Sequence, residues 1–414
     1  MSGPSVDADR ILADIEAIAG FSETPPLVGY SRPTFSEAWA QARAYVIAEA
    51  EAAGGETRTD GAGNLHIRSR QVGWERKVWL SGSHIDSVPS GGKYDGVMGV
   101  VIPLEILRVA PELPLELVVF AEEEGTTFGL GMLGSRGWSG EISGETLARL
   151  RNRHGESYIE AGRAYGVDPE QLGTLDGNAY FGLVEVHAEQ GISLWNEGRP
   201  LALVDRINGR RQIEARLLGE ANHAGSTGML ERKDALACAA EVIVESEQLG
   251  RRYDRELAKT VVTVGVVEAE PNAANVIAGQ VRLTVDFRAQ EEEMLSRGEA
   301  EIRRRIEEIA AHRGIGAEVL LTERIEPSPL SEALCNALAT ASQQIGYPAP
   351  LVASGALHDA AVLAPHLPTA MVFVASKDGI SHNPGEFSRI EDIAGAAQLL
   401  AQLFWSRPEG LTDG

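Results

Sequence analysis

The sequence has few cysteines, little positive charge and no long apolar run, and each shortage excludes a class of protein. Cys238 and Cys335 are too few for a disulfide framework, and their alanine-rich surroundings are typical of buried thiols in a reducing compartment. The formal net charge of −23 would repel phosphate backbones and anionic membranes, so we expect neither nucleic acid nor a membrane as a partner. No segment reaches the roughly 18 apolar residues of a spanning helix, and the stretch from Met1 to Asp9 does not resemble a signal peptide. We therefore expect a cytoplasmic protein.

The length of 414 residues predicts two domains, because a single hydrophobic core rarely grows to that size. The pattern changes between Gly209 and Pro327, where strands are predicted over 212–218, 260–268, 281–288 and 317–325, with helices over 234–249 and 291–313. This β-α-β-β-α-β order is the ferredoxin-like, split arrangement. We expect an α/β domain with a mixed sheet flanked by helices at 1–208 and 327–414, and an inserted domain at 209–326.

Four apolar strands of the first domain are each followed by histidine or acidic residues. The strand-like segments around 77–83, 115–121, 181–186 and 369–375 lead to His84, to the run Glu122-Glu123-Glu124, to His187 and to His382. Asp95 follows His84 in a glycine-rich turn. Ligands of open α/β sheets bind at the carboxyl ends of the strands, so we expect these side chains to lie along one rim.

The side chains on this rim suit two metal ions. A first-row ion needs roughly three ligands from histidine and carboxylate, with positions left open for water and substrate. The expected ligands are His84, Asp95, Glu123, His187 and His382. Asp95 can serve both ions because a carboxylate has two oxygens. Asp86 is expected to hold the imidazole of His84 by its other nitrogen, and Glu122 to accept a proton from the attacking water.

Each of these residues also has a structural interpretation. His84 or His187 taken alone fits a hydrogen-bonded histidine at a strand end, three glutamates in a row fit a solvated loop, and Asp95 fits a turn former. The coincidence of all the clusters at strand ends favours metal binding. The segment 129–134 matches G-x-G-x-x-G, but it follows three glutamates that would repel a pyrophosphate, so nucleotide binding is not expected.

Several motifs together carry a resemblance to a known family. They are His84-x-Asp86, Gly92-x-x-Asp95-Gly96, Glu122-Glu123-Glu124-Gly125, His187-x-Glu189-Gln190-Gly191, Asn222-His223-Ala224-Gly225 and Ser381-His382-x-Pro384-x-Glu386. In order and spacing, from about residue 30 to residue 400, the chain resembles the M20-type metallopeptidases. Within them it is most similar to the branch of N-carbamoyl-L-amino acid hydrolases, allantoate amidohydrolases and β-ureidopropionases.

This resemblance implies two divalent ions (Zn, Mn, Co or Ni) and a homodimer. One ion would be held by His84, Asp95 and His187, and the other by Asp95, Glu123 and His382. Glu122 would be the general base and then protonate the leaving nitrogen. The inserted domain would be a lid that also mediates dimerisation.

The resemblance also assigns roles to residues of the inserted domain. His223 would reach the site of the partner subunit and stabilise the oxyanion, and Asn275 and Arg288 would bind the substrate carboxylate. Arginine suits that task because it can grip a carboxylate with two hydrogen bonds. The structural alternative for Arg288 is an ion pair with Asp286. The alternative for His223 is an exposed histidine without a functional role. Gln190 and Gln212 are further candidates for contact with the substrate.

The sequence departs from the family pattern near the expected pocket. Gly228 stands where a proline is common, which should loosen the loop that carries His223. Leu357 replaces a usual glycine, and Ile192 and Trp195 add bulk after His187. The amide or ureido group that is cut therefore stays open.

The function that these residues predict is hydrolysis of a linear C–N bond in a small carboxylate-bearing substrate, such as an N-carbamoyl-L-amino acid or allantoate. An aminoacylase, a dipeptidase or another amide-conjugate hydrolase of the same superfamily is the alternative. A non-catalytic ligand-binding relative is a more remote one.

Overall fold

The computed structural model describes residues 3–257, 259–406 and 408, and the contacts within it divide the chain into two compact units. Unit 1 comprises Met1–Asp205, Pro329–Val352 and His358–Gly414, and unit 2 comprises Arg206–Ser328 and Ala353–Leu357. The segment 353–357, expected in the first domain, thus belongs to unit 2. The expectation for the start of the chain includes Met1 and Ser2, which lie outside the described residues.

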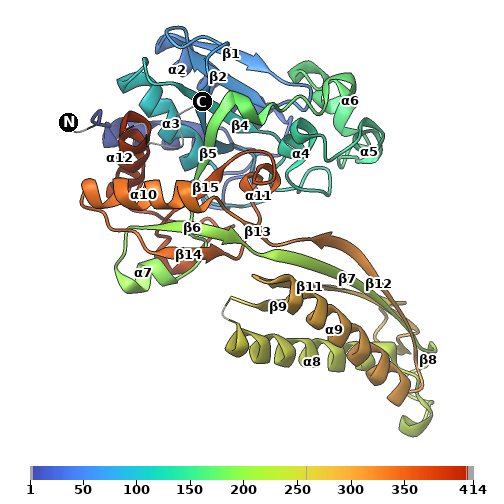
Figure 1. Ribbon diagram of the computed structural model, residues 1–414. Helices are drawn as coiled ribbons and strands as arrows, with labels where there is room; N and C mark the ends of the chain where they lie inside the picture. Colours follow the sequence, from blue (N-terminus) through green and yellow to red (C-terminus); the bar gives the residue numbers. More distant parts are fainter. Residues whose placement is uncertain (1–2, 258, 407, 409–414) are drawn as a thin grey trace. The chain divides into compact units, whose positions relative to one another are not determined.

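Unit 1 is built on a nine-stranded mixed sheet in the order β1-β2-β4-β3-β5-β15-β6-β13, with β14 paired to β6 (Figure 1). The strands are β1 Gly55–Thr59, β2 Leu65–Ser69, β3 Val78–His84, β4 Leu115–Phe120, β5 Tyr180–Ala188, β6 Leu201–Ile207, β13 Ser328–Pro329, β14 Leu351–Ser354 and β15 Thr369–Val374. β3 runs parallel to β4 and β5, and β15 runs parallel to β5. The carboxyl ends of these four strands therefore meet at one edge of the sheet.

The main core of unit 1 lies between this sheet and five helices: α1 Ala8–Gly20, α2 Glu37–Ala52, α3 Val97–Val109, α10 Glu332–Gln344 and α12 Ile390–Ser406. The apolar spacing of α1 explains its place, because Ile11, Ile15 and Ile18 lie on one face and are fully buried. Ser36 begins α2 by accepting a hydrogen bond from the amide of Trp39.

Shorter elements complete unit 1. They are the helices α4 Leu133–Ser139, α5 Gly144–Arg149, α6 Tyr158–Gly162, α7 Ser193–Glu197 and α11 Asp359–Leu363, and the 3-10 helices η1 Arg163–Tyr165, η2 Pro169–Gln171, η3 Gly177–Ala179 and η5 Lys377–Gly379. A satellite apolar cluster that includes Phe128, Leu133 and Tyr158 forms within the segment between β4 and β5.

Unit 2 has the expected β-α-β-β-α-β order. Its main elements are β7 Gly209–Leu218, α8 Ala235–Glu256, β9 Val261–Glu270, β11 Gln280–Ala289, α9 Glu292–His312 and β12 Gly316–Ile325. The four strands form an antiparallel sheet in the order β12-β7-β11-β9, and the helices cover one of its faces (Figure 1). Alternate residues of β7, Ile213, Ala215 and Leu217, are buried in the core that this sheet forms with α8 and α9. The short strands β8 Asn222–His223 and β10 Val276–Ile277 pair with each other, and η4 Met229–Glu231 follows β8.

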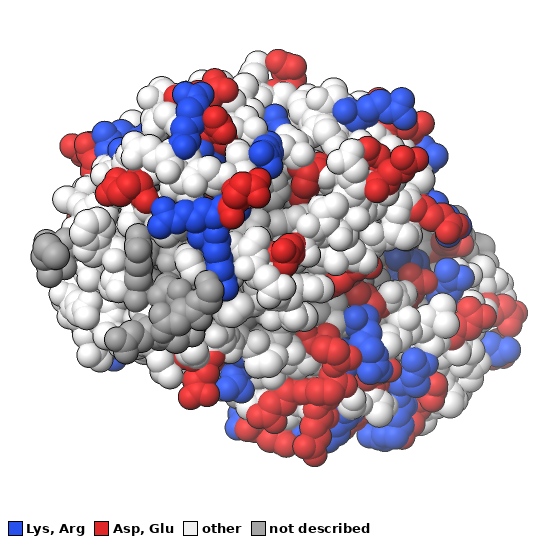
Figure 2. All heavy atoms as spheres, turned by 45° about the horizontal axis from the view of Figure 1, so that its top comes forward, with Lys and Arg blue, Asp and Glu red and all other residues white. Residues whose placement is uncertain are grey.

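The predicted α/β class with a mixed sheet is confirmed. Among the described helices, none is long and apolar enough to cross a membrane. On the face drawn in Figure 2, Lys and Arg side chains lie among Asp and Glu side chains rather than in a patch of their own.

Candidate metal centre

A cluster of histidines and acids forms where the parallel strands of unit 1 end. His84 is the last residue of β3, and Asp95 lies in the turn before α3. Glu123 and Glu124 follow β4, His187 lies near the end of β5, and His382 follows β15. His84, Asp95 and His187 are buried, whereas the side chain of His382 is half exposed. The rim expected from the sequence is present.

Asp95 is at the centre of this cluster. Its Oδ1 lies 3.1 Å from His187 Nε2 and 4.0 Å from His84 Nε2, and its Oδ2 lies 3.1 Å from His382 Nε2. Three groups of possible ligand atoms lie within 4.8 Å of one another: His84, Asp95 and His187; Asp95, Glu124 and His382; and His84, Glu123 and Glu124. The two oxygens of Asp95 thus face two different donor sets, which is the arrangement that a shared carboxylate needs.

The turn that carries Asp95 requires a glycine beside it. Gly96 has a positive φ of 67°, and a Cβ added there would lie 2.5 Å from the ring of His84. A side chain at this position would therefore push the His84 imidazole out of the cluster.

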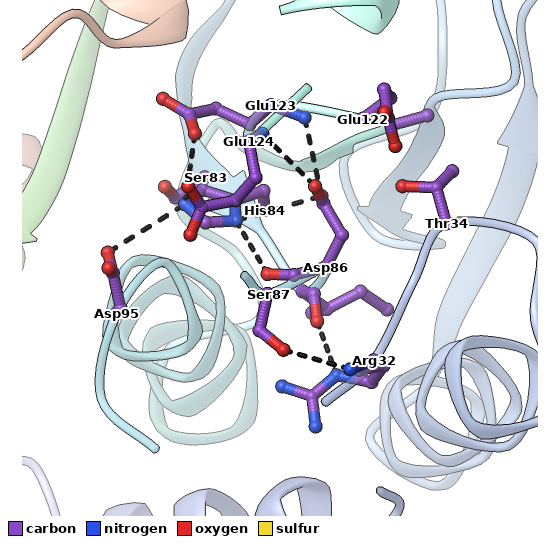
Figure 3. Close-up of polar contacts among 12 residues, drawn as sticks. Arg32, Thr34, Ser83, His84, Asp86, Ser87, Asp95, Glu122, Glu123 and Glu124 are labelled. Carbon is purple, nitrogen blue, oxygen red and sulfur yellow. Dashed lines mark hydrogen bonds and ion pairs between the residues drawn. The ribbon is translucent and has the colours of Figure 1, made fainter. Parts of the chain in front are cut away.

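The structure directs the side chain of Glu122 away from the cluster. Its carboxylate accepts hydrogen bonds from the amides of Thr127 at 2.9 Å and Phe128 at 2.8 Å. In Figure 3 it faces Thr34, whereas Glu123 extends toward His84. β4 ends at Phe120, and Glu122 has a positive φ of 55°, so the alternation of a strand does not continue through the glutamates. The carboxylate of Glu122 is thus bound to backbone amides and not presented to the cluster, as the expected base would be.

Glu124 is the residue that sequence reasoning missed. Glu124 belongs to the same acidic run as Glu122 and Glu123, so a signal was present in the sequence. Three consecutive glutamates, however, do not show by their spacing which of them faces the metal donors. In the structure Glu124 Oε2 lies 3.6 Å from His382 Nε2, and Glu124 joins two of the three donor groups.

Asp86 supports the cluster in two ways, one of which differs from the expectation. The Nδ1 of His84 donates to the main-chain oxygen of Asp86 at 3.0 Å, while the carboxylate of Asp86 is 3.7 Å from the same nitrogen. That carboxylate instead accepts the amides of Glu123 at 3.4 Å and Glu124 at 3.1 Å (Figure 3). The imidazole is held by the backbone, and the carboxylate of Asp86 fixes the glutamate segment.

The tautomers of the two buried histidines follow from these bonds. A carbonyl oxygen can only accept, so His84 donates through Nδ1, and His187 likewise donates through Nδ1 to the oxygen of Ala188 at 3.1 Å. The Nε2 atom of His84 is then available as a lone-pair donor, and that of His187 becomes one when it releases the proton that it donates to Asp95. Burial lowers the pKa of His84 to about 4, which keeps its ring neutral. Burial also acts to lower the pKa of His187, but its hydrogen bond to Asp95 outweighs this and raises the pKa to about 9.

The cluster crowds several buried carboxyl groups together, which makes their ionised forms costly without a cation. Burial raises the pKa of Glu123 and Glu124 well above the usual value, and neighbouring carboxylates raise it further. Burial acts to raise the pKa of Asp95 as well, but the hydrogen bonds from the histidines lower it well below its usual range. Among the described residues, His84 Nε2 and Glu124 Oε1 are buried without a hydrogen-bond partner. Buried nitrogen and oxygen donors without a hydrogen-bond partner, gathered around a carboxylate, fit divalent cations.

Gln190, a candidate for contact with the substrate, has its side chain at the cluster. Its side-chain amide donates to Asp95 Oδ2 at 3.1 Å and lies 3.5 Å from His382 Nε2. Its φ of 56° is positive, so the backbone is held in a strained conformation that directs the amide to the centre.

The remaining candidates lie in unit 2. His223 is exposed on β8, and its Nδ1 accepts hydrogen bonds from the amides of Gly225 and Ser226, both at 3.1 Å. The amide of Ala224 donates to the main-chain oxygen of Asn275 at 3.0 Å, so the structure brings His223 and Asn275 to one end of unit 2. The Nε2 of the His223 ring then carries the proton and points away from these backbone bonds.

Arg288 and Gln212 lie on adjacent strands, beside the same acid. Arg288 donates from Nε to Asp286 Oδ1 at 2.9 Å and from its terminal nitrogens to Asp286 Oδ2 and to the main-chain oxygen of Gly355, both at 3.2 Å. Gln212 on β7 is the cross-strand neighbour of Asp286 on β11. The ion pair considered for Arg288 is present, and it fixes the guanidinium rather than leaving it mobile.

Comparison with known proteins identifies the family. The description Peptidase family M20/M25/M40 matches residues 80–406. The chain belongs to this family. It is 36% identical over 401 residues to the N-carbamoyl-L-amino acid amidohydrolase of Geobacillus stearothermophilus, covering 93% of this chain and 95% of that protein. It is 34% identical over 383 residues to the allantoate amidohydrolase of Bacillus subtilis (strain 168), covering 91% and 92%.

A solved structure shows the same architecture over nearly the whole chain. The amidase of the hydantoinase/carbamoylase family from Burkholderia multivorans superposes with a TM-score of 0.86 at 31% identity, covering 97% of this chain and 98% of that one. The resemblance to the M20 family that the motifs indicated is thereby confirmed.

Proposed function

We propose that this chain is a two-metal amidohydrolase that cleaves a linear C–N bond of a small ureido acid, an N-carbamoyl-L-amino acid or allantoate. The observation that carries the proposal is the carboxylate of Asp95 between two donor sets, one with His84 and His187 and one with Glu124 and His382. The names of the similar proteins support the substrate class.

The donor sets assign the ligands. His84, Asp95 and His187 would hold one ion, and Asp95, Glu124 and His382 the other. Zn, Mn, Co and Ni all accept such mixed nitrogen and oxygen donors. Ions of this kind supply Lewis-acid polarisation of the substrate carbonyl and a water of lowered pKa.

Glu123 would then be the general acid–base residue that transfers a proton from water to the leaving nitrogen. Its Oε2 lies 3.7 Å from His84 Nε2, on the cluster side of the glutamate segment, and it is not needed in either of the two ligand sets. Glu123 would accept a proton from the attacking water and deliver it to the leaving nitrogen. Glu122 would instead hold the backbone of residues 127–128, where its carboxylate accepts two amides.

Unit 2 would supply recognition. Arg288, fixed by Asp286, would bind the substrate carboxylate, and Gln212 would lie beside it. Asn275, which lies with His223 at the other end of the β7–β11 pair, would complete this site in the partner subunit. His223, with its Nε2 proton free of backbone bonds, would donate to the developing oxyanion.

Unit 2 would also join two copies of the chain, with His223 serving the partner subunit. β9 is an edge strand of its sheet, and its side chains Val261, Val266 and Val267 are exposed. An unpaired apolar edge favours association with an identical strand. The net charge of −23 argues against a nucleic-acid partner.

A substrate panel tests the proposal. Purified protein would be assayed with Mn²⁺, Co²⁺, Zn²⁺ or Ni²⁺ against N-carbamoyl-L-amino acids, allantoate, N-acetyl amino acids and dipeptides. We expect ureido acids to be cleaved with kcat/KM roughly 100-fold above the acetyl compounds and dipeptides, because a site built for ureido hydrogen bonds rejects substrates that lack them. Turnover of dipeptides or N-acetyl amino acids alone would replace the proposed substrate class with an aminoacylase or dipeptidase activity.

A further inference from the structure

A buried acid outside the three donor groups ties two parts of the metal centre together. Glu386 is 5% exposed and follows His382 in the same loop. Its Oε2 accepts the amides of Tyr94 at 2.9 Å and Asp95 at 3.1 Å. Its Oε1 accepts a hydrogen bond from the hydroxyl of Ser381 at 3.0 Å.

These bonds connect segments that are far apart in the sequence. The turn with Asp95 lies between β3 and α3, and the loop with Ser381 and His382 follows β15. Ser381 Oγ also lies 3.3 Å from Asp95 Oδ2, the oxygen that faces His382. Glu386, Ser381 and Asp95 therefore form a closed set of polar contacts around the second donor set.

A glycine makes room for this contact. A Cβ added at Gly92 would lie 2.0 Å from Glu386 Oε2 and 2.3 Å from its carboxyl carbon. No side chain at Gly92 can coexist with the carboxylate in its present place, so the turn is shaped to receive Glu386 as well as to present Asp95.

We propose that Glu386 is a positioning residue that sets the separation of Asp95 and His382, and thereby the affinity of the second metal ion. The inference rests on the proposed two-metal function. Glu386 acts through hydrogen bonds to the backbone of the Asp95 turn and to Ser381, and it does not ligate an ion itself. Loss of these bonds would loosen Asp95 relative to His382 while leaving His84 and His187, which are held by main-chain oxygens, in place.

Metal counting on four variants tests the inference. Metal-free full-length protein would be titrated with Co²⁺, followed by its d–d absorption, and the bound metal would be counted by elemental analysis. Glu386→Ala and Gly92→Ala should bind the second ion at least tenfold more weakly and keep the first. Glu386→Gln should bind both, because its amide oxygen can accept the two amides and its NH₂ group can donate to Ser381 Oγ.

Glu105→Ala is the matched control. Glu105 is fully buried in the same unit and accepts hydrogen bonds from the amide of Asp7 and the side chain of Arg10, away from the metal donors. This variant should lose stability and keep both ions, which separates positioning from general destabilisation.

The other outcomes contradict the inference. Two ions bound by Glu386→Ala and Gly92→Ala with wild-type affinity would overturn it, and so would a Glu386→Gln variant as weak as Glu386→Ala, since charge rather than hydrogen bonding would then matter. A wild-type chain that binds fewer than two ions would contradict the proposed function itself.

Discussion

The carboxyl groups of Glu122 and Glu123 face different surroundings although the two residues are adjacent. Glu122 is bonded to the amides of Thr127 and Phe128, and Glu123 lies 3.7 Å from the ring of His84. In the proposed assignment Glu123 exchanges a proton with water at the cluster and Glu122 does not, so the two positions give a matched pair of variants.

Glu123→Gln should keep both metal ions and lose turnover. Removal of a general base lowers kcat by about 10²–10⁴-fold. Glu122→Gln should change kcat by less than about tenfold, because its amide oxygen can still accept the bonds from residues 127 and 128. Steady-state kinetics with metal analysis of both proteins makes the comparison. A Glu122→Gln protein with two ions and no turnover would restore the base role to Glu122.

Glu122 and Glu123 also show which part of the site could not be predicted from the sequence. The apolar strands and the residues that follow them predicted the rim, since β3, β4, β5 and β15 must end together if they run parallel. The choice among Glu122, Glu123 and Glu124 depends on backbone dihedrals beyond the end of β4, including the positive φ of Glu122. A run of three identical residues contains no information about those dihedrals.

The two histidines on either side of Asp95 should affect different ions. His187→Ala removes a donor of the first set and His382→Ala a donor of the second, so each variant should lose one ion and most of its activity. Elemental analysis after dialysis against metal-free buffer counts the ions. Loss of both ions in both variants would indicate a single shared site rather than two sets.

The guanidinium of Arg288 should be needed for substrate affinity more than for folding. Arg288→Lys cannot form two parallel bonds to a carboxylate, so KM should rise roughly tenfold. Arg282→Lys is the control, because Arg282 lies on the same strand and pairs with Glu214 and Glu268. Michaelis–Menten kinetics on a ureido acid compares them. An equal effect of both substitutions would place the role of Arg288 in the stability of the sheet.

His66 should make the stability of the protein fall at alkaline pH. Burial acts to lower its pKa, but hydrogen bonds to Asp60 and Glu116 outweigh this and raise it to about 10 from 6.5. A raised folded-state pKa gives stability that is complete below pH 6.5 and is lost as the pH rises through about 10.

Denaturant unfolding of metal-free protein at pH 7 and pH 9 measures this loss. The wild type should lose on the order of 2 kcal/mol more of its unfolding free energy over this interval than His66→Gln, whose residue 66 does not titrate. Parallel pH dependence of the two proteins would show that His66 is not charged in the fold.

The fold was predicted best where a regular spacing of apolar residues extends over a long segment. The predicted strands of unit 2 differ from β7, β9, β11 and β12 only at their ends. β1 and β6 were missed. β1 has only Gly55 buried along its length, so it carries no apolar alternation. The segment 140–178 forms helices too short for a helical period to register.

A metal titration tests the central claim most directly. Chelated, metal-free protein would receive increasing Mn²⁺ or Co²⁺ while hydrolysis of an N-carbamoyl-L-amino acid and of allantoate is followed. We predict no activity without metal, and activity on at least one of these substrates that saturates at two ions per chain. Hydrolysis by the metal-free protein, or saturation at one ion, would contradict the account of Asp95 as a carboxylate shared between two ions.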